Sequence, residues 1–400
     1  MAEAVGAKLQ IAPEDRYSRL RLITWWNQET IAQSRVLVVG AGALGNEILK
    51  NLALVGFQNV VIVDLDAIEV TNLSRSVLFS ESTIGQPKAS AAAAAMRRIL
   101  PESKAMGLTA NVVSGIGLGF FEWADVVLGG LDNREARLWL NRACWRMNKP
   151  FIDGAIEGIN GVARVFLPGK PPCYECTLGE VDWQILQHRL ACNLLTRAEM
   201  ESGKVPTTPT IASIIGGIQV QEALKHIHSV NTLSGEAFVF EGLNHTSYRV
   251  EYTENPDCMS HHTHADVVKV AEKSSELTLH ELWVRAVNEL GGNVVIEFSR
   301  EVIHKLVCPT CGEEEEMFVA LGTIAYEDGR CHCSGEMRIV HALHSYSGTE
   351  SFGGRRLNEL GLPLFDVFVA RNDESERAYL MSGDAGKVLG SLATTKEPSR

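Results

Sequence analysis

The stretch VLVVGAGALGNEILKNLALVGFQNVVIVDLD, residues 36–66, decides the fold. Val36–Val39 are apolar and rich in valine, which is typical of a buried parallel strand. The next residues, Gly40–Gly45, fit the pattern G-x-G-x-x-G. Apolar residues then recur at helical spacing over Asn46–Val55, and a second apolar run follows at Val60–Val63. This order of strand, glycine turn, helix and strand predicts a βαβ unit of an open, mostly parallel α/β sheet.

The same stretch indicates a nucleotide site. Gly40, Gly42 and Gly45 allow a tight turn that can approach a phosphate, and the following helix offers it free N–H groups and the positive end of its dipole. Asp64 comes about 20 residues after the glycines, where an acidic side chain can bind a ribose hydroxyl. A tight turn without a ligand is the alternative interpretation. The motif does not specify the nucleotide or the reaction.

The whole chain has the composition of a soluble globular protein. Its 400 residues suggest at least two domains, and 45% hydrophobic and 22% charged residues are ordinary values. A net charge of -12 argues against general nucleic-acid binding. We expect no membrane span and a cytoplasmic location, because no apolar run approaches ~20 residues and the N-terminal residues lack an apolar signal core. Nine cysteines then favour metal sites or a reactive thiol over disulfides.

Cations and an acid follow the later strands. Arg75 and Lys88 lie past the carboxyl ends of predicted strands, on the ligand side of an open sheet, and suit a triphosphate better than a nicotinamide cofactor. Asp132 follows the strand predicted at 124–131 and serves either as the N-cap of the next helix or as a Mg²⁺ ligand. Arg19 could reach the phosphates only by folding over its own glycine turn or a partner's. Taken alone, each of these cations also fits an exposed surface.

Two short cysteine motifs predict a first zinc site. Cys173 and Cys176 form C-x-x-C, and Cys258 and His261 form C-x-x-H far downstream. Together they supply a tetrahedral Cys₃His set, with His262 as the rival fourth ligand. A closed site of this kind would stabilise the fold and leave catalysis to other residues.

A second set of cysteines predicts a zinc ribbon. Cys308 and Cys311 are followed by Cys331 and Cys333, giving C-x₂-C…C-x-C with each pair on a hairpin turn. The acidic run Glu313–Glu316 is expected to be a solvated loop.

One further cysteine is a candidate nucleophile. Cys192 lies in the polar linker Val181–Lys204, with Arg189 and Arg197 near it in sequence. Neighbouring cations lower the pKa of a thiol and favour the reactive thiolate, although an inert cysteine remains the alternative. Cys144, in a helical pattern, is expected to be an inert core residue.

The chain divides into four predicted parts. These are an N-terminal arm and helix at 1–33, an α/β domain at 34–262 with a cysteine-bearing crossover at 177–210, a linker at 263–276, and a smaller C-terminal α+β domain at 277–390 with the zinc ribbon at 308–333. Residues after Gly386 are expected to be loose.

Eight segments together resemble the ThiF/MoeB superfamily of adenylating enzymes, and most of all the catalytic subunits of ubiquitin-like-protein activating enzymes of the NEDD8 and SUMO kind. In chain order they are RYSRLRL, the stretch from VLVVGAGALG to NLSRSVLF, IGQPKA, LDNREAR, PFIDGAIEGINGVARVF, PPCYECTL, VPTTPTIAS and NPDCMSHH, covering roughly residues 16–262. The resemblance implies a Rossmann-like, doubly wound sheet as a ThiF-type adenylation domain. The compact single chain resembles prokaryotic members, including those of bacterial ubiquitin-like conjugation systems.

The resemblance also implies roles for individual residues. The implied nucleotide-binding residues are Gly40, Gly42, Gly45, Asp64, Asp66, Asn72, Arg75, Gln86, Lys88, Asp132 and Asn133. The implied catalytic residues are Arg19, Arg75, Lys88, Asp132 and Cys192. Asp132 would coordinate Mg²⁺ beside ATP, and Arg19 would act as an arginine finger across a homodimer interface. Two zinc ions would complete the cofactors.

The implied substrate is a small β-grasp protein, ubiquitin-like or sulfur-carrying, that ends in glycine. Its carboxylate would attack ATP to give an acyl-adenylate and pyrophosphate, and the acyl group would pass to Cys192 as a thioester and then to a ubiquitin-conjugating-type enzyme. Two departures bear on this expectation: His261 stands where the family usually has cysteine, and the Cys192 linker is short. Three alternatives stay open: a sulfur-carrier adenylyltransferase without a thioester, a non-catalytic nucleotide-binding zinc scaffold, and a dehydrogenase.

Overall fold

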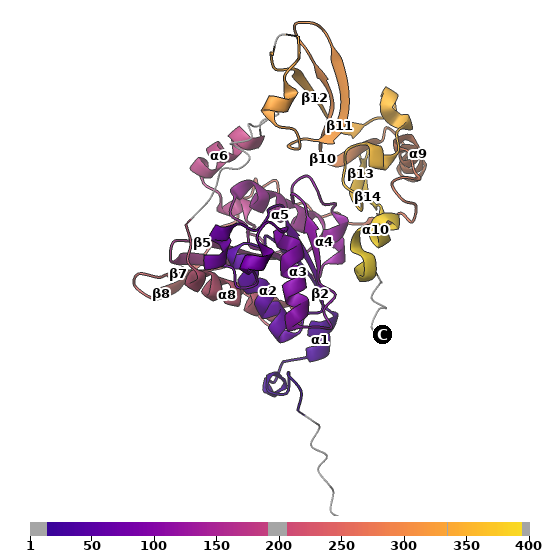
Figure 1. Cartoon of the computed structure of the whole chain (residues 1–400). Helices are drawn as coiled ribbons and strands as arrows, with labels where there is room; N and C mark the ends of the chain where they lie inside the picture. Colours follow the sequence, from indigo (N-terminus) through magenta and orange to yellow (C-terminus); the bar gives the residue numbers. More distant parts are fainter. Residues whose placement is uncertain (1–13, 191–205, 334, 394–400) are drawn as a thin grey trace, which may run out of the picture.

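The computed structural model describes residues 14–190, 206–333 and 335–393, which form two β-sheets (Figure 1). The strands of the first sheet are β1 (Arg35–Val39), β2 (Asn59–Asp64), β3 (Met106–Thr109), β4 (Val126–Gly129), β5 (Phe151–Glu157), β6 (Asn160–Phe166), β7 (Glu236–Glu241) and β8 (Thr246–Glu251). The helices of this part of the chain are α1 (Gln28–Gln33), α2 (Ala43–Val55), α3 (Lys88–Ile99), α4 (Gly119–Trp123), α5 (Arg134–Arg146), α6 (Glu180–Leu190) and α8 (Pro209–Ile227). Within the described residues, no helix combines the length and apolarity that a membrane crossing requires.

The first sheet has the strand order β3-β2-β1-β4-β5-β6-β7-β8. Its first five strands pair in parallel, and the last three join in antiparallel steps. The chain order reverses between β1 and β4, and open α/β sheets bind their ligands beyond the carboxyl ends of the strands at such a switch point. The predicted doubly wound, mostly parallel sheet is therefore confirmed, and the glycine turn that follows β1 lies at this switch point.

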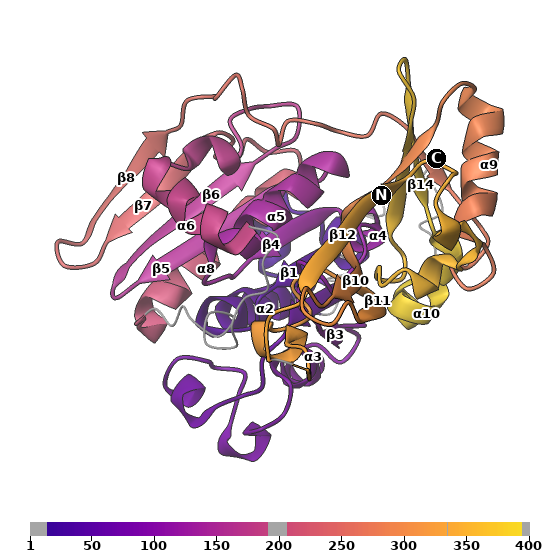
Figure 2. The ribbon, with the colours of Figure 1, turned by 90° about the horizontal axis from the view of Figure 1, so that it is seen from above.

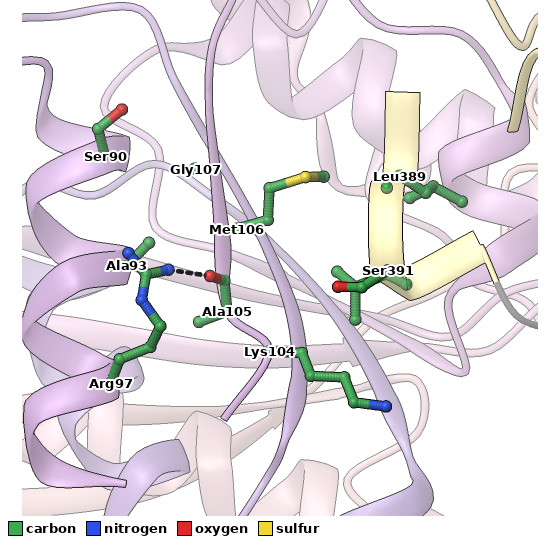
Figure 3. A pocket seen from close by; sticks show the side chains of 11 residues that line it. Ser90, Ala93, Arg97, Lys104, Ala105, Met106, Gly107, Leu389 and Ser391 are labelled. Carbon is green, nitrogen blue, oxygen red and sulfur yellow. Dashed lines mark hydrogen bonds between the residues drawn. The ribbon is translucent and has the colours of Figure 1, made fainter. Parts of the chain in front are cut away.

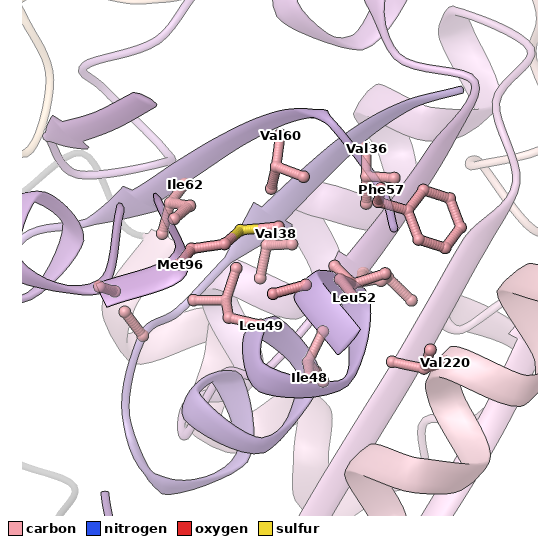
Figure 4. Close-up of a cluster of buried hydrophobic side chains, with 14 of the residues drawn as sticks. Val36, Val38, Ile48, Leu49, Leu52, Phe57, Val60, Ile62, Met96 and Val220 are labelled. Atoms are coloured by element: carbon pink, nitrogen blue, oxygen red, sulfur yellow. The ribbon is translucent and has the colours of Figure 1, made fainter. Parts of the chain in front are cut away.

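Helices cover both faces of this sheet. On one face α2, α3 and α8 pack against valines and isoleucines of β1 and β2, as Figure 4 shows for Ile48, Leu49, Leu52 and Val220. On the other face α4 and α5 share a buried cluster with residues from the end of the chain, including Phe365, Val367 and Leu389. The core of the first sheet is thus completed partly by the second part of the chain.

The second sheet has the order β11-β10-β13-β14-β9, with β12 pairing with β10. Its elements are β9 (Val267–Lys269), α9 (Leu279–Leu290), β10 (Val295–Val307), β11 (Glu314–Ala320), β12 (Ile339–Tyr346), β13 (Val367–Arg371), β14 (Glu376–Leu380) and α10 (Ala385–Leu389). Helix α9 packs on this sheet, on the far side of the molecule from the hairpin β7–β8 (Figure 2). Strand β9 lies within the residues predicted as a linker and pairs in parallel with β14.

Two local expectations were wrong. Residues 387–393 are not loose, because α10 and the turn Gly390–Ala393 bury Leu389 and Leu392 against the first sheet, and residues 394–400 lie outside the described residues. The acidic run Glu313–Glu316 is not a loop, because β11 begins at Glu314. Its three strand glutamates pair with cations of neighbouring segments: Glu314 with Lys305, Glu315 with Arg338, and Glu316 with Arg355. These cations come from other segments of the chain, so the local sequence pattern does not show them. Their ion pairs offset the repulsion among the three glutamates of the strand.

Candidate functional site

The glycine turn joins β1 to α2 at the switch point of the first sheet. Gly40 has φ +93°, and its N–H donates to the Val63 carbonyl at 2.8 Å. A Cβ on Gly40 would overlap the Gly130 carbonyl oxygen, and one on Gly45 would overlap the Gly40 carbonyl oxygen. A Cβ on Gly42 would meet nothing within 4 Å. Gly40 and Gly45 are therefore required by packing, whereas Gly42 opens onto free space at the helix N-terminus, where a phosphate could approach.

Asp64, the last residue of β2, is hydrogen-bonded to the glycine turn. Its Oδ2 accepts the Ala41 N–H at 2.6 Å, and its Oδ1 accepts the Asp66 N–H at 2.8 Å. Burial raises the pKa of the Asp64 carboxyl, while these two hydrogen bonds act in the opposite direction. The residue predicted to bind a ribose thus also stabilises the conformation of the glycine turn.

The predicted cation Lys88 is buried at the start of α3 and paired with Asp66. Its Nζ lies 2.7 Å from Asp66 Oδ2, and its N–H donates to the Asp66 carbonyl at 2.9 Å. Asp66 is largely exposed, with 62% of its side chain open to solvent, so a phosphate could compete with it for the ammonium group.

Three other predicted nucleotide-binding residues lie on the segment between β2 and α3. Arg75 is half-buried, and its Nη1 donates to the Thr71 carbonyl at 3.0 Å. Asn72 is buried, and its Oδ1 accepts the Glu69 N–H at 2.9 Å. Gln86 is exposed and donates to the Ser82 carbonyl at 3.2 Å. The side chains of all three residues form hydrogen bonds within their own segment. Among the described residues, no hydrogen bond joins the Gln86 side chain to the glycine turn.

Asp132 and Asn133 follow β4 and have different roles. Asn133 is the N-cap of α5, because its Oδ1 accepts the Ala136 N–H at 2.8 Å. The alternative interpretation of Asp132 as the N-cap is therefore wrong. Asp132 is exposed, and its carboxylate receives one long hydrogen bond, from Asn133 Nδ2 at 3.4 Å. The carboxylate that the family resemblance implies as a Mg²⁺ ligand is thus exposed just past the end of β4.

Beneath Asp132 lies a buried ionic network that the motifs did not reveal. Asp153, fully buried on β5, accepts from Arg137 Nε at 3.0 Å and from Arg164 Nε and Nη2 at 3.0 and 2.5 Å. Arg137 also donates to the carbonyls of Leu131 and Gly154. The network therefore holds the loop that carries Asp132. An aspartate inside an apolar strand was the one local signal that could have indicated it.

The N-terminal arm lies at the opposite end of α2 from the glycine turn. Tyr17 packs at Gly56, the C-cap of α2, and the 13 residues of this helix separate Gly56 from Gly42 by ~20 Å. Arg19 is close to Tyr17 in the chain, is exposed, and forms no ion pair with any described residue. The structure therefore does not bring Arg19 to the glycine turn of its own chain.

The first cysteine motif and the second converge in space. Cys173 Sγ lies 3.8 Å from Cys176 Sγ and 3.5 Å from Cys258 Sγ, and Cys176 Sγ lies 3.3 Å from His261 Nε2. A tetrahedron with Zn–S bonds of about 2.3 Å has S···S edges of ~3.8 Å, so this donor set fits zinc. The rival ligand His262 instead contacts Glu376, at 3.0 Å.

Neighbouring groups orient these four donors. Asn141 donates to Cys173 Sγ at 3.4 Å, and the His261 ring stacks on Trp145 with centroids 4.5 Å apart. His261 Nδ1 lies 3.7 Å from Glu254, which resembles the carboxylate–histidine pairs that support metal ligands. Between the two cysteines of the first motif, buried Glu175 accepts from Ser260 of the second motif, so the two motifs are also joined without a metal.

The four ribbon cysteines meet at one end of β10, β11 and β12. Cys308 Sγ lies 3.6 Å from Cys333 Sγ, and Cys311 Sγ lies 3.7 Å from Cys331 Sγ. All four sulfurs lie within 4.8 Å of one another. The Cys311 N–H and nearby groups lower the pKa of the Cys308 thiol to about 6, whereas the pKa values of the Cys311 and Cys331 thiols are raised, so the donor set and its geometry are what fit zinc.

Two cysteines, Cys144 and Cys192, belong to neither of the two cysteine clusters. Cys192 lies outside the described residues. Cys144 is fully buried in α5, and burial raises the pKa of its thiol well above the usual value. Cys144 is therefore unsuited to act as a nucleophile.

A cavity of about 510 Å³ lies away from the glycine turn, between β3 and the end of the described chain (Figure 3). Arg97, Lys104 and Met106 line one side, and Leu389 and Ser391 line the other. None of the predicted site residues lines it, so we assign it no part in the nucleotide site.

Comparison with known proteins places the chain in a family. It is 39% identical over 150 residues to the NEDD8-activating enzyme E1 catalytic subunit of Schizosaccharomyces pombe, covering 36% of this chain and only 34% of that relative's length. It is 32% identical over 254 residues to the SAMP-activating enzyme E1 of Haloferax volcanii, covering 61% of this chain and 87% of that protein. The fold is similar to the crystal structure of E. coli MccB with ATP, with a TM-score of 0.52 at 22% identity over 63% of this chain and 75% of that one. The family model described as "ThiF family" matches residues 15–260, and we conclude that the chain belongs to the ThiF family.

Proposed function

We propose that the protein activates the C-terminal carboxylate of a small ubiquitin-like or sulfur-carrier protein by adenylating it. The observation that carries this proposal is the edge of the first sheet, where the open turn at Gly42, the ammonium group of Lys88 and the exposed carboxylate of Asp132 lie past the ends of neighbouring strands. Relatives with activating-enzyme names support the same class of substrate.

In the proposed reaction a carboxylate oxygen of the substrate attacks the α-phosphorus of ATP. The bond from this phosphorus to the β-phosphate bridging oxygen breaks, pyrophosphate leaves, and an acyl-adenylate forms. Lys88 and Arg75 would stabilise the negative charge that develops on the phosphates. Asp132 would hold Mg²⁺, which neutralises phosphate charge, and the N–H groups at the start of α2 would bind phosphate oxygens.

In the next step we propose that the Cys192 thiolate attacks the acyl carbon and expels AMP, which leaves a thioester on the enzyme. A sulfur-carrier activator that forms no thioester is the second candidate, favoured by the shortness of the linker Val181–Lys204 that carries Cys192. A thiol-sensitive adduct that is lost in Cys192→Ala and kept in Cys144→Ala supports the first candidate. Adenylation without any such adduct supports the second.

Exchange of labelled pyrophosphate into ATP tests the proposed adenylation directly. The chain is incubated with ATP, Mg²⁺ and a glycine-terminated β-grasp protein captured from its own source cells in the presence of ATP. We expect exchange with this protein and none after removal of its terminal glycine. Binding of a nicotinamide cofactor, or ATP binding without any exchange, would contradict the proposal and favour a dehydrogenase or a scaffold, respectively.

We further propose that Arg19 acts on the nucleotide site of a second copy of the chain. Its position at the far end of α2 supports action across a homodimer. Mixing Arg19→Ala with Asp132→Ala chains is expected to restore roughly a quarter of the sites if half the dimers are mixed and each mixed dimer keeps one complete site. Dimers that form without any recovery of exchange would show that Arg19 does not act in this way.

A further inference from the structure

A third cluster of metal-binding side chains lies outside both cysteine sites. His262 Nε2 is 3.0 Å and His264 Nδ1 is 3.2 Å from the same oxygen, Glu376 Oε1. The three donor atoms lie within 4.8 Å of one another, and the two imidazole rings meet edge to face with centroids 5.2 Å apart. Two imidazoles and one carboxylate form a donor set that zinc and other divalent transition metals use in proteins.

The surroundings of Glu376 fix it for this role. Arg371 Nη2 donates to Glu376 Oε2 at 2.9 Å, so the arginine holds one carboxylate oxygen and leaves the other to the two histidines. Hydrogen-bonded carboxylates of this kind are usual around metal sites. Ligands about 2.0–2.2 Å from zinc are ~3.3–3.5 Å apart in a tetrahedron, so a small outward shift of the donors would accommodate the ion.

A second observation concerns the other nitrogen of His264. The His264 side chain is 4% exposed, and its Nε2 has no hydrogen-bond partner among the described residues. His264 lines a cavity of about 80 Å³ whose other polar lining residues are His262, Glu297, Ser299 and the two cations Arg146 and Arg371. A buried imidazole nitrogen without a partner is costly unless a water or ligand satisfies it. The cavity has room for water that would satisfy Nε2, which leaves Nδ1, on another side of the imidazole ring, for the proposed ion.

We propose that His262, His264 and Glu376 bind a divalent metal ion of the zinc class, independently of the two cysteine clusters. The ion would join the two sheets, because the histidines follow the Cys258–His261 motif of the first sheet and Glu376 begins β14 of the second. The His262 side chain is 47% exposed, so solvent reaches the site directly. Because this site offers three side-chain ligands and each cysteine cluster offers four, we expect its occupancy to respond more readily to the free metal concentration.

Metal content of the full chain tests this proposal. After equilibration with micromolar free zinc, we expect three zinc ions per wild-type chain and two in His262→Ala and Glu376→Gln. His344→Ala, which removes an exposed histidine on β12, is the matched control and should retain three. Two ions in the wild type and in all variants would overturn the proposal and leave the cluster as a hydrogen-bonded contact between the sheets. Because His262 is half-exposed, its variant keeps the test decisive if Glu376→Gln does not fold.

Cobalt distinguishes the third site from the cysteine clusters. Co²⁺ added to the chain that already holds two tightly bound zinc ions should give d–d absorption without the thiolate-to-metal charge-transfer bands that cysteine ligands produce. This absorption should disappear in His262→Ala and persist in His344→Ala. Charge-transfer bands of full intensity would mean that cobalt had entered a cysteine cluster, and they would contradict the proposed site.

Discussion

At the scale of single residues, the two later glycines of the turn have different physical tasks. Gly45 gives the space that the Gly40 carbonyl fills, whereas Gly42 leaves the helix N-terminus uncovered. We therefore expect Gly45→Ala to destabilise the fold by about 1–3 kcal/mol through overpacking. Gly42→Ala should leave the unfolding midpoint nearly unchanged and weaken ATP binding, because its methyl group would occupy the approach of a phosphate.

Thermal unfolding and calorimetric titration with ATP measure these two effects separately. If Gly42→Ala bound ATP as tightly as the wild type, the turn would not be the phosphate site.

Asp132 and Asn133 form a second matched pair. Asn133→Ala removes the N-cap of α5 and should lower the free energy of unfolding by about 1 kcal/mol. Asp132→Ala should leave stability within about 0.5 kcal/mol of the wild type, because its side chain is exposed, and should abolish pyrophosphate exchange. Denaturant unfolding and the exchange assay check both. Exchange at the wild-type rate in Asp132→Ala would remove this residue from the proposed chemistry.

How far the site could be predicted depends on whether its parts are close in sequence. The glycine turn and each pair of cysteines are local patterns, and the structure brings their members together. The network of Arg137, Asp153 and Arg164 and the cluster at Glu376 join side chains from separate elements, and no short motif records such a meeting. The sequence also offered Asp132 as the N-cap of α5, whereas the structure has Asn133 at that position. Either residue type can cap a helix, and the backbone conformation determines which of the two does.

At the scale of elements, strand β11 shows why the sequence pattern led to the wrong prediction of a loop at Glu313–Glu316. Strand β11 begins with three glutamates, which strands disfavour, yet each pairs with a cation from another segment. In Figure 1, β10, β11 and β12 project from the rest of the molecule, and only a small cluster around Ile303 and Leu306 supports their outer half. A metal ion would therefore contribute much of the stability of this projection.

Cys311→Ser tests this contribution. We expect the variant to lose one zinc ion per chain and the backbone amides of β11 and β12 to exchange hydrogen much faster, while those of β1 and β4 stay protected. Metal analysis and hydrogen exchange measure the two results, and His332→Ala, at an exposed residue between ribbon cysteines, is the control. Full zinc content in Cys311→Ser would contradict the assignment of this ligand.

At the scale of the whole molecule, the two sheets share one hydrophobic core. Leu389 of α10 is 2% exposed and belongs to the cluster that includes Leu37 and Val39 of β1. In the same region, the Trp123 indole N–H donates to the Leu392 carbonyl at 3.0 Å. The sequence predicted a smaller C-terminal part with its own strands, and the structure has a second sheet there, but the sequence could not predict this shared cluster of apolar residues. The apolar residues of α10 are too few to form a periodic signal.

Leu389→Ala measures this coupling. Truncating a buried leucine should lower the free energy of unfolding by about 2–5 kcal/mol, whereas Lys387→Ala, on an exposed position of the same helix, should change it by less than about 0.5 kcal/mol. Denaturant unfolding followed separately at the first sheet and at the ribbon should show that the first sheet is destabilised. An unchanged first sheet would mean that α10 only rests on its surface.

The shared core also sets an order of events during synthesis. Every strand of the first sheet is made before Phe365–Leu392 leave the ribosome, so one apolar face of that sheet remains incomplete until those residues arrive. Contacts between residues so distant in sequence form slowly, and exposed apolar surface favours aggregation in the meantime. The nascent chain is therefore expected to need protection by a chaperone until its second sheet has been translated, and ribosome-bound chains stopped near residue 262 should bind chaperones more strongly than chains released after residue 393.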